Sequence, residues 1–129
     1  MAENEKLRIG TRGSPLALKQ TSLVIDLLKR NNPILQQPGA IEMVVIKTTG
    51  DREQSQLLSE IGGKGLFTKE LDEAMLRGDI EIAIHSMKDM PTFLPNGIIL
   101  HTLADRLDSR DAFISQSFNN ITELPAGSK

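Results

Sequence analysis

Apolar positions in the first part of the chain alternate between short β-type runs and a longer helical repeat. The run from Leu7 to Thr11 is short and alternating, which predicts an opening strand. Ser14-Pro15 follows it, and these residues suit the N-cap and the first turn of a helix. Apolar residues then recur at helical spacing until Asn31-Asn32-Pro33 ends the helix; they are Leu16, Leu23, Val24, Leu27 and Leu28.

The middle of the chain predicts two more strands and a second helix. The β-rich run 41–48 stops at Gly50-Asp51, where Asp51 is interpreted as a turn residue. A helical stripe then follows the glycine-rich segment 62–65, and Gly78 is placed to end that helix. The stripe consists of Leu66, Phe67, Leu71, Ala74 and Met75. The apolar run 80–84 predicts a strand that leads directly into His85-Ser86-Met87-Lys88-Asp89.

Two further strands are expected at 97–101, after the turn at Pro95-Asn96-Gly97, and at 111–115. Strands that alternate with helices predict an α/β layered fold with a largely parallel sheet. The last residues, 124–129, have the composition of a loop that approaches one more strand. We therefore expect the chain to be truncated.

Composition narrows the possible functions. With 39% apolar and 25% charged residues the chain has the balance of a soluble globular protein, and no apolar run could cross a bilayer. A net charge of −2, four Phe and no Trp or Tyr argue against a nucleic-acid-binding surface. Without cysteine there is no disulfide framework or thiolate metal site, and no metal is expected. The polar N-terminus favours the cytoplasm, although the lack of cysteine also fits the periplasm.

Candidate chemistry lies at three strand-to-loop junctions, where ligands gather in open parallel sheets. Arg12 and Ser14 follow the first strand, Lys64 lies in the glycine-rich loop, and 85–89 follows the strand at 80–84. Each feature also has a simpler interpretation. The glycine-rich loop lacks Walker A spacing, Ser14 could be only a cap, His85 a hydrogen-bonded structural residue, and Lys88-Asp89 an exposed ion pair. Pattern alone therefore indicates an anion-binding α/β domain.

Five blocks of the sequence, in order, resemble the motifs of the porphobilinogen deaminase (hydroxymethylbilane synthase) family. They are Arg12-Gly13-Ser14-Pro15-Leu16-Ala17-Leu18, residues 62–71, residues 82–91, Asp108-Ser109-Arg110-Asp111-Ala112-Phe113, and Leu124-Pro125-Ala126-Gly127-Ser128. The resemblance runs from Leu7 to the end of the chain.

The resemblance implies a reaction and an architecture. Members condense porphobilinogen head to tail with loss of ammonia and release hydroxymethylbilane, a precursor of haem and other tetrapyrroles. They build it on a dipyrromethane cofactor that is attached covalently to a cysteine. The fold has two periplasmic-binding-protein-like domains, with a mixed, largely parallel sheet flanked by helices, and a small third domain. The expected partner is porphobilinogen alone, in a monomer without nucleic-acid or membrane partners.

Carried over by position, Asp89 is the expected catalytic acid/base, because a carboxylate near the pyrrole N–H groups stabilises the cations formed as ammonia leaves and rings join. A neighbouring cation such as Lys88 helps to keep it ionised. The expected cofactor-binding residues are Arg12, Ser14, Lys64, Lys69, Ser86 and Lys88. The expected substrate-binding residues are Arg12, Ser14 and Gln20. Arg110 lies at the expected hinge between domains.

The same resemblance predicts the domain limits. Residues 1–107 are expected to form an incomplete first domain, and 108–129 the crossover and first strand of the second. The cofactor cysteine is expected beyond Lys129, so a chain of these 129 residues alone is expected to be inactive and marginally folded. The alternative function is a non-catalytic small-anion binding domain of periplasmic-binding-protein type. An interaction module has no support in the sequence.

Overall fold

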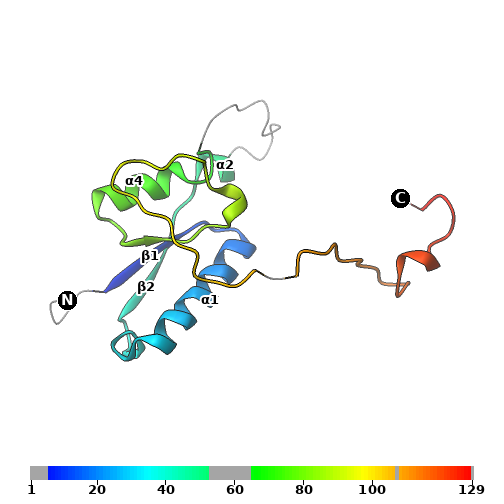
Figure 1. The fold of residues 1–129 in the computed structure, drawn as a ribbon, viewed down its shortest axis with the longest axis horizontal. Helices are drawn as coiled ribbons and strands as arrows, with labels where there is room; N and C mark the ends of the chain where they lie inside the picture. The colour runs from blue at the N-terminus through cyan, green and yellow to red at the C-terminus, as the bar shows by residue number, and fades with distance from the viewer. Residues whose placement is uncertain (1–5, 53–64, 107, 129) are drawn as a thin grey trace.

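A computed structural model describes residues 6–52, 65–106 and 108–128. The strands and helices between residues 7 and 89 form one compact unit, from which an extended C-terminal segment leads away (Figure 1). The strands are β1 (Leu7–Thr11), β2 (Ile41–Val45) and β3 (Ile82–Ala83). The α-helices are α1 (Pro15–Asn31), α2 (Thr49–Arg52) and α4 (Lys69–Arg77). Short 3₁₀ helices are η1 (Pro33–Gln36), η2 (Met87–Asp89) and η3 (Ile121–Glu123).

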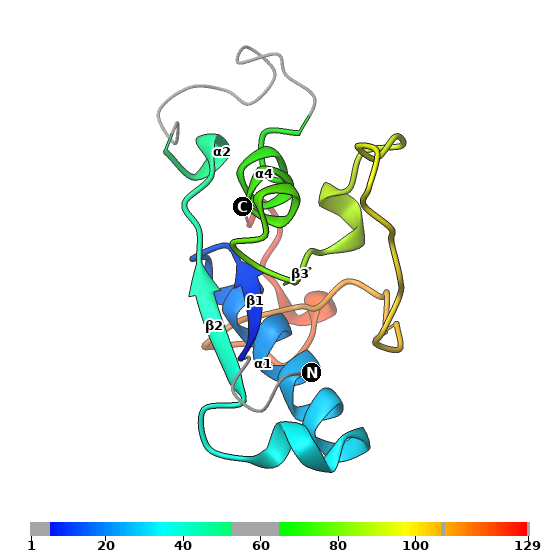
Figure 2. The same ribbon diagram turned by 90° about the vertical axis from the view of Figure 1, so that its left-hand side faces the viewer.

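The sheet has the strand order β2-β1-β3, and both pairings are parallel. Leu7 pairs with Ile41 on one side of β1, and Ile9 pairs with Ile82 on the other. The chain thus runs from β1 to one edge of the sheet and then crosses to the other. Helices α1 and α4 lie on opposite sides of the sheet (Figures 1 and 2). The predicted α/β class with parallel strands is confirmed. The strand order reverses its direction between β1 and β3.

Helix α1 begins and ends where the sequence predicts. Ser14 caps it, because its Oγ accepts a hydrogen bond from the Ala17 amide at 3.2 Å. The apolar stripe is only partly correct: Val24 is buried, but Leu16 and Leu23 are 52% and 47% exposed. The small described sheet contacts α1 mainly through β1 and cannot cover every apolar residue of a 17-residue helix.

Helix α4 begins at Lys69, later than the predicted stripe from Leu66. Residues 65–68 form a tight turn instead, which Gly65 permits with a φ of +81°. Gly78 ends α4 in the left-handed conformation, with its amide donating to the Met75 carbonyl at 3.0 Å. Leu71 is fully buried in this part of the core, so the amphipathic character of the helix is confirmed.

Two of the predicted strands are shorter in the described residues, and two do not form. β2 ends at Val45, and β3 contains only two residues, although the Ile84 amide still donates to Gly10 O at 2.9 Å. The segments 97–101 and 111–115 form no strand. Ile99 and Ile114 are 80% and 91% exposed there, so β-propensity without a pairing partner did not produce a strand.

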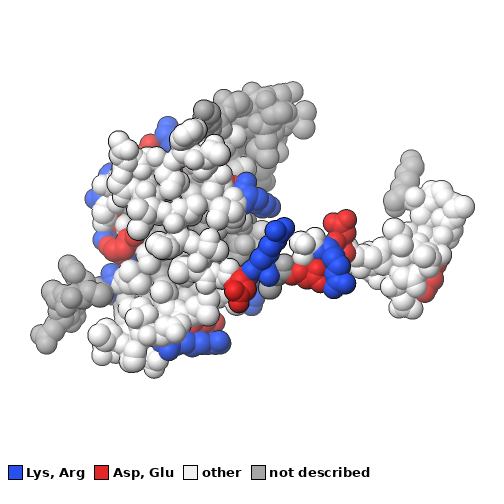
Figure 3. Space-filling view, viewed as in Figure 1, with Lys and Arg blue, Asp and Glu red and all other residues white. Residues whose placement is uncertain are grey.

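Acidic and basic side chains lie close together along the extended segment on the face drawn in Figure 3. One exposed pair there joins Arg110 and Asp108. Large parts of the compact unit in this view carry neither charge. No helix in the described ranges combines the length and the apolar character that crossing a bilayer requires.

Candidate functional site

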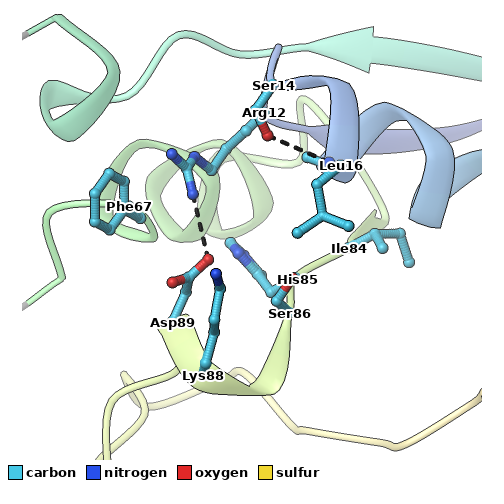
Figure 4. A pocket seen from close by; sticks show the side chains of 10 residues that line it. Arg12, Ser14, Leu16, Phe67, Ile84, His85, Ser86, Lys88 and Asp89 are labelled. Atoms are coloured by element: carbon cyan, nitrogen blue, oxygen red, sulfur yellow. Dashed lines mark hydrogen bonds and ion pairs between the residues drawn. The ribbon is translucent and has the colours of Figure 1, made fainter. Parts of the chain in front are cut away.

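A cavity of about 290 Å³ opens where β1 and β3 end, at the reversal of strand order. Such a reversal is the usual ligand-binding position in open α/β sheets. The cavity is formed by the loop after β1, the start of α1, Phe67 in the turn before α4, and the segment after β3 (Figure 4). Its lining residues are Arg12, Ser14, Leu16, Ala17, Phe67, Ile84, His85, Ser86, Lys88 and Asp89.

Arg12 is the most constrained side chain in this cavity. Its Nη2 donates to Asp51 Oδ1 at 2.5 Å, and its Nε lies 3.2 Å from both carboxylate oxygens of Asp51. The guanidinium lies over the Phe67 ring at 4.0 Å from the ring centre. Its remaining nitrogen, Nη1, donates to Asp89 Oδ2 at 3.3 Å. Arg12 therefore has a fixed orientation and joins Asp51 to Asp89.

Asp51 was predicted only as a turn residue, but its side chain also binds Arg12 and Thr48. It lies in α2, and its Oδ2 accepts a hydrogen bond from the buried Thr48 hydroxyl at 2.7 Å. The bond from Arg12 lowers the pKa of the Asp51 carboxyl, and the same bond raises the pKa of Arg12. The neighbouring Gly50 is required by packing, because a Cβ there would lie 2.2 Å from the Phe67 ring. Periodicity gave no signal for this long-range pairing.

Asp89 lies at the end of η2, whose turn is closed by a hydrogen bond from the Asp89 amide to Ser86 O at 3.0 Å. The simpler interpretation of Lys88-Asp89 as an exposed ion pair is wrong within the described part of the chain, because Asp89 pairs with Arg12 instead. Lys88 is exposed and lines the same cavity, with its side chain running beside Asp89 (Figure 4). Asp89 also borders a second cavity, on the α4 side. Asp89 thus borders both cavities.

The two serines predicted as hydroxyl donors lie in the cavity, and the predicted substrate-binding residue Gln20 accepts a hydrogen bond from one of them. Ser14 and Ser86 both line it. Ser86 Oγ donates to Gln20 Oε1 at 2.7 Å, which ties η2 to α1. Gln20 is not among the lining residues of this cavity.

The two remaining predicted cations are placed differently. Lys69 is 70% exposed, lies 4.0 Å from Glu73, and borders the second cavity rather than the first. Lys64 lies outside the described residues. The structure therefore brings together Arg12, Lys88 and Asp89, with Ser14 and Ser86, and leaves Lys69 apart from them.

Among the described residues, His85 is not the hydrogen-bonded structural residue that the sequence favoured. Both of its ring nitrogens are buried, and neither has a hydrogen-bond partner among the described residues. The ring lines the cavity beside Asp89 (Figure 4). Sequence reasoning missed this role because the cavity that the ring lines is completed by Arg12 and Phe67, which come from distant parts of the chain.

Asp51→Asn is expected to lower the free energy of unfolding at pH 7 by about 1–3 kcal/mol, the usual range for losing charged hydrogen bonds. The depressed pKa of Asp51 means that its stabilisation is complete above the ordinary value of 3.8 and is lost as the pH falls through the lower folded value. Urea unfolding at pH 7 and at pH 3 measures both effects. The variant should therefore lose less stability on acidification than the unmodified protein.

Asp108→Asn is the matched control for this prediction. Asp108 is also paired with an arginine, Arg110, but its side chain is 58% exposed, so solvent screens the pair. The control should unfold like the unmodified protein at both pH values. Equal effects of the two substitutions would contradict a special contribution of the Arg12–Asp51 pair.

Comparison with known proteins identifies the family. The family model described as "Porphobilinogen deaminase, dipyromethane cofactor binding domain" matches residues 7–129. The chain belongs to the porphobilinogen deaminase family. This domain has a fold of the periplasmic-binding-protein type, in agreement with the parallel sheet described above.

Relatives in the porphobilinogen deaminase family are similar along nearly all of the chain. The chloroplastic porphobilinogen deaminase of Pisum sativum is 58% identical over 122 residues, which cover 95% of the chain and 33% of that protein. The porphobilinogen deaminase of Sulfurimonas denitrificans is 53% identical, with 94% and 37% covered. That of Paracoccus denitrificans is 51% identical, with 94% and 38% covered. The chain spans between a third and two fifths of these relatives.

No group of three or more His, Cys, Asp or Glu side chains suited to hold a metal ion occurs in the ranges 6–52, 65–106 and 108–128. The acidic side chains of the candidate site are instead bound to Arg12. The polar groups of the candidate site are charged and hydroxyl side chains together with the His85 ring.

Proposed function

We propose that the full-length protein is a porphobilinogen deaminase of tetrapyrrole biosynthesis, which joins porphobilinogen units head to tail with loss of ammonia to give hydroxymethylbilane. The observation that carries the proposal is the position of the Asp89 carboxylate. It lies in a cavity at the ends of β1 and β3, 3.3 Å from Arg12 and beside Lys88. Family membership supports the same activity, although the chain spans only part of its relatives.

The charges of the cavity suit a pyrrole that carries acidic side chains. The ring N–H is a donor and matches the Asp89 carboxylate, whereas acetate and propionate groups match the cations Arg12 and Lys88. Ser14 and Ser86 add hydroxyl donors for the same carboxylates. A flat, acidic heterocycle can therefore satisfy both kinds of group at once.

The same donor set fits a dipyrromethane cofactor, which is built from two such rings. We propose that Arg12, Ser14, Ser86 and Lys88 hold its acidic groups, with Lys64 and Lys69 as further cations. The matched family model is named for binding this cofactor. The sequence contains no cysteine, so the attachment residue is not one of these 129 residues. When bound, the cofactor supplies the free pyrrole carbon to which porphobilinogen units are added.

Within this site, Asp89 would act on charge and protons at the pyrrole nitrogen. When the aminomethyl C–N bond breaks, its electron pair leaves with ammonia, and positive charge spreads from the methylene carbon to the ring N–H. A carboxylate held at that N–H lowers the free energy of this cation, because the interaction is stronger in the charged state than in the neutral one. Arg12 and Gln20 would support the site, Arg12 by binding acidic groups and Gln20 by orienting Ser86.

We also propose a monomer whose only partner is porphobilinogen, with residues 1–107 in a first domain and 108–129 as the start of a second. A cytoplasmic location is proposed for a bacterial source, since the term "chloroplastic" is attached to the pea relative and not to those from Sulfurimonas and Paracoccus. Analytical ultracentrifugation and cell fractionation test these two points.

Mass spectrometry and turnover of the purified full-length protein test the main proposal. The intact mass should exceed the sequence mass by one covalently attached dipyrromethane, and porphobilinogen should be consumed with release of ammonia. A protein that lacks the added mass and does not turn over porphobilinogen would contradict the proposal. Binding of porphobilinogen without turnover, abolished by Arg12→Ala, would favour the non-catalytic anion-binding domain.

A further inference from the structure

The His85 ring is a buried polar group of the cavity that the described residues leave without a partner. Neither Nδ1 nor Nε2 makes a hydrogen bond within the described ranges. The backbone that carries the ring is fixed, because the preceding residue, Ile84, donates to Gly10 O at 2.9 Å and so continues the sheet. Buried polar atoms without partners are costly and rare in native proteins, so such a group calls for a ligand or a chemical role.

Charged groups from three different elements act electrostatically on this ring. Asp72 comes from α4 and is only 8% exposed, Asp89 comes from η2, and Arg12 comes from the loop after β1. Burial lowers the pKa of His85 below its ordinary value of 6.5, so the imidazole is neutral at pH 7. The charges of Asp72 and Asp89 act in the opposite direction and favour the protonated ring. Burial likewise raises the pKa of Asp72.

We infer that His85 is a second catalytic residue of this site, the base that removes the proton from the pyrrole α-carbon as two rings are joined. The inference rests on the proposed function and adds a step that Asp89 does not cover. Asp89 is bound to Arg12, whereas the ring nitrogens of His85 are unpaired in the described part of the chain, and the His85 side chain lines the same cavity.

The step balances without any further reactant. The C–N bond of the protonated aminomethyl group of porphobilinogen breaks, and its electron pair leaves on nitrogen as ammonia. The methylene carbon then bonds to the free α-carbon of the terminal pyrrole. The C–H bond at that α-carbon breaks, its electron pair returns to the ring, and the proton passes to the unprotonated nitrogen of His85. The nearby carboxylates of Asp72 and Asp89 stabilise the resulting imidazolium.

The kinetic test uses His85→Gln and His85→Asn in the full-length protein with its cofactor attached, and porphobilinogen deuterated at the free α-carbon. We expect kcat to fall about a hundred-fold or more, with a small change in KM. A primary isotope effect larger than that of the unmodified protein should appear, since proton removal becomes rate-limiting. The acidic limb of the pH profile of kcat should disappear, because the titrating base has been removed. A purely structural residue would not change the isotope effect.

A second measurement does not depend on turnover. In NMR spectra of ¹⁵N-histidine-labelled protein, the imidazole signal of His85 is identified by its absence in His85→Gln. The pKa obtained from this signal should lie below the ordinary value of 6.5. Asp72→Asn removes a charge that raises the pKa of His85, so this titration and the acidic limb of kcat should both move to lower pH. The control is Glu73→Gln, on the next residue of α4, where the side chain is 50% exposed. It should leave both values unchanged.

The outcomes separate this inference from the proposed function. If the unmodified protein turns over porphobilinogen and Asp89→Asn abolishes turnover, but His85→Gln keeps full rate and an unchanged isotope effect, His85 is not the base. If the unmodified protein does not turn over porphobilinogen at all, the proposed function itself fails. If both His85 variants fail to fold, Asp72→Asn carries the test, and an acidic limb that does not move overturns the inference.

Discussion

Asp89→Asn is expected to lower kcat for porphobilinogen on the order of a hundred- to a thousand-fold, with the cofactor still attached. Asparagine preserves the size of the side chain and can still accept a hydrogen bond from Arg12, which lies 3.3 Å from Asp89 Oδ2. What it removes is the negative charge that stabilises cationic pyrroles. Because that charge matters most in the transition state, kcat should fall more than KM rises. Steady-state kinetics of the full-length protein measures kcat and KM, and its intact mass shows whether the cofactor is still attached.

Asp89→Glu separates charge from placement. It keeps the carboxylate but moves it by about one methylene, so a large loss of kcat in this variant would show that position matters. Asp79→Asn serves as the control, because Asp79 is also paired with an arginine, Arg77 at 2.8 Å, but its side chain is 58% exposed and borders neither cavity. Asp89→Asn with a kcat within twofold of the unmodified protein would remove Asp89 from the mechanism.

Arg12→Lys is expected to lower kcat/KM about ten- to a hundred-fold although it keeps the positive charge. An arginine in this position binds Asp51 through two nitrogens, lies over Phe67 and still reaches Asp89. A lysine ammonium is a point charge without a planar fork and cannot keep these contacts together. We also expect a smaller fraction of the protein to carry the cofactor, which the intact mass measures.

Arg8→Lys is the control for this substitution. Arg8 also binds a carboxylate, with its Nε 3.2 Å from Glu81 Oε1, but it lies earlier in β1 and does not line the cavity. The control should keep normal kcat/KM and a normal cofactor content. If Arg8→Lys and Arg12→Lys reduce kcat/KM equally, the loss reflects general destabilisation and not the site.

Local sequence determined the elements whose signals are contained within a few residues. The strand Leu7–Thr11, the cap at Ser14 and the left-handed end of α4 at Gly78 were all predictable, because capping, periodicity and glycine conformation act over one or two helical turns. The motifs around Arg12 and Asp89 also indicated the family, which the comparisons confirmed. Local β-propensity was misleading at 97–101 and 111–115, where no described strand lies alongside.

Only the tertiary structure decided how the site is assembled. Asp51 lies 39 residues from Arg12, and Asp89 lies 77 residues from it, yet both bind the same guanidinium. Likewise, the pKa of His85 is shifted by the charges of Asp72 in α4 and of Arg12 in the loop after β1. These contacts depend on the strand order β2-β1-β3, which places the ends of β1 and β3 side by side. The sequence by itself determined which chemical groups are present, whereas the packing of distant segments determined which of them meet, because no local pattern encodes a distance across the sheet.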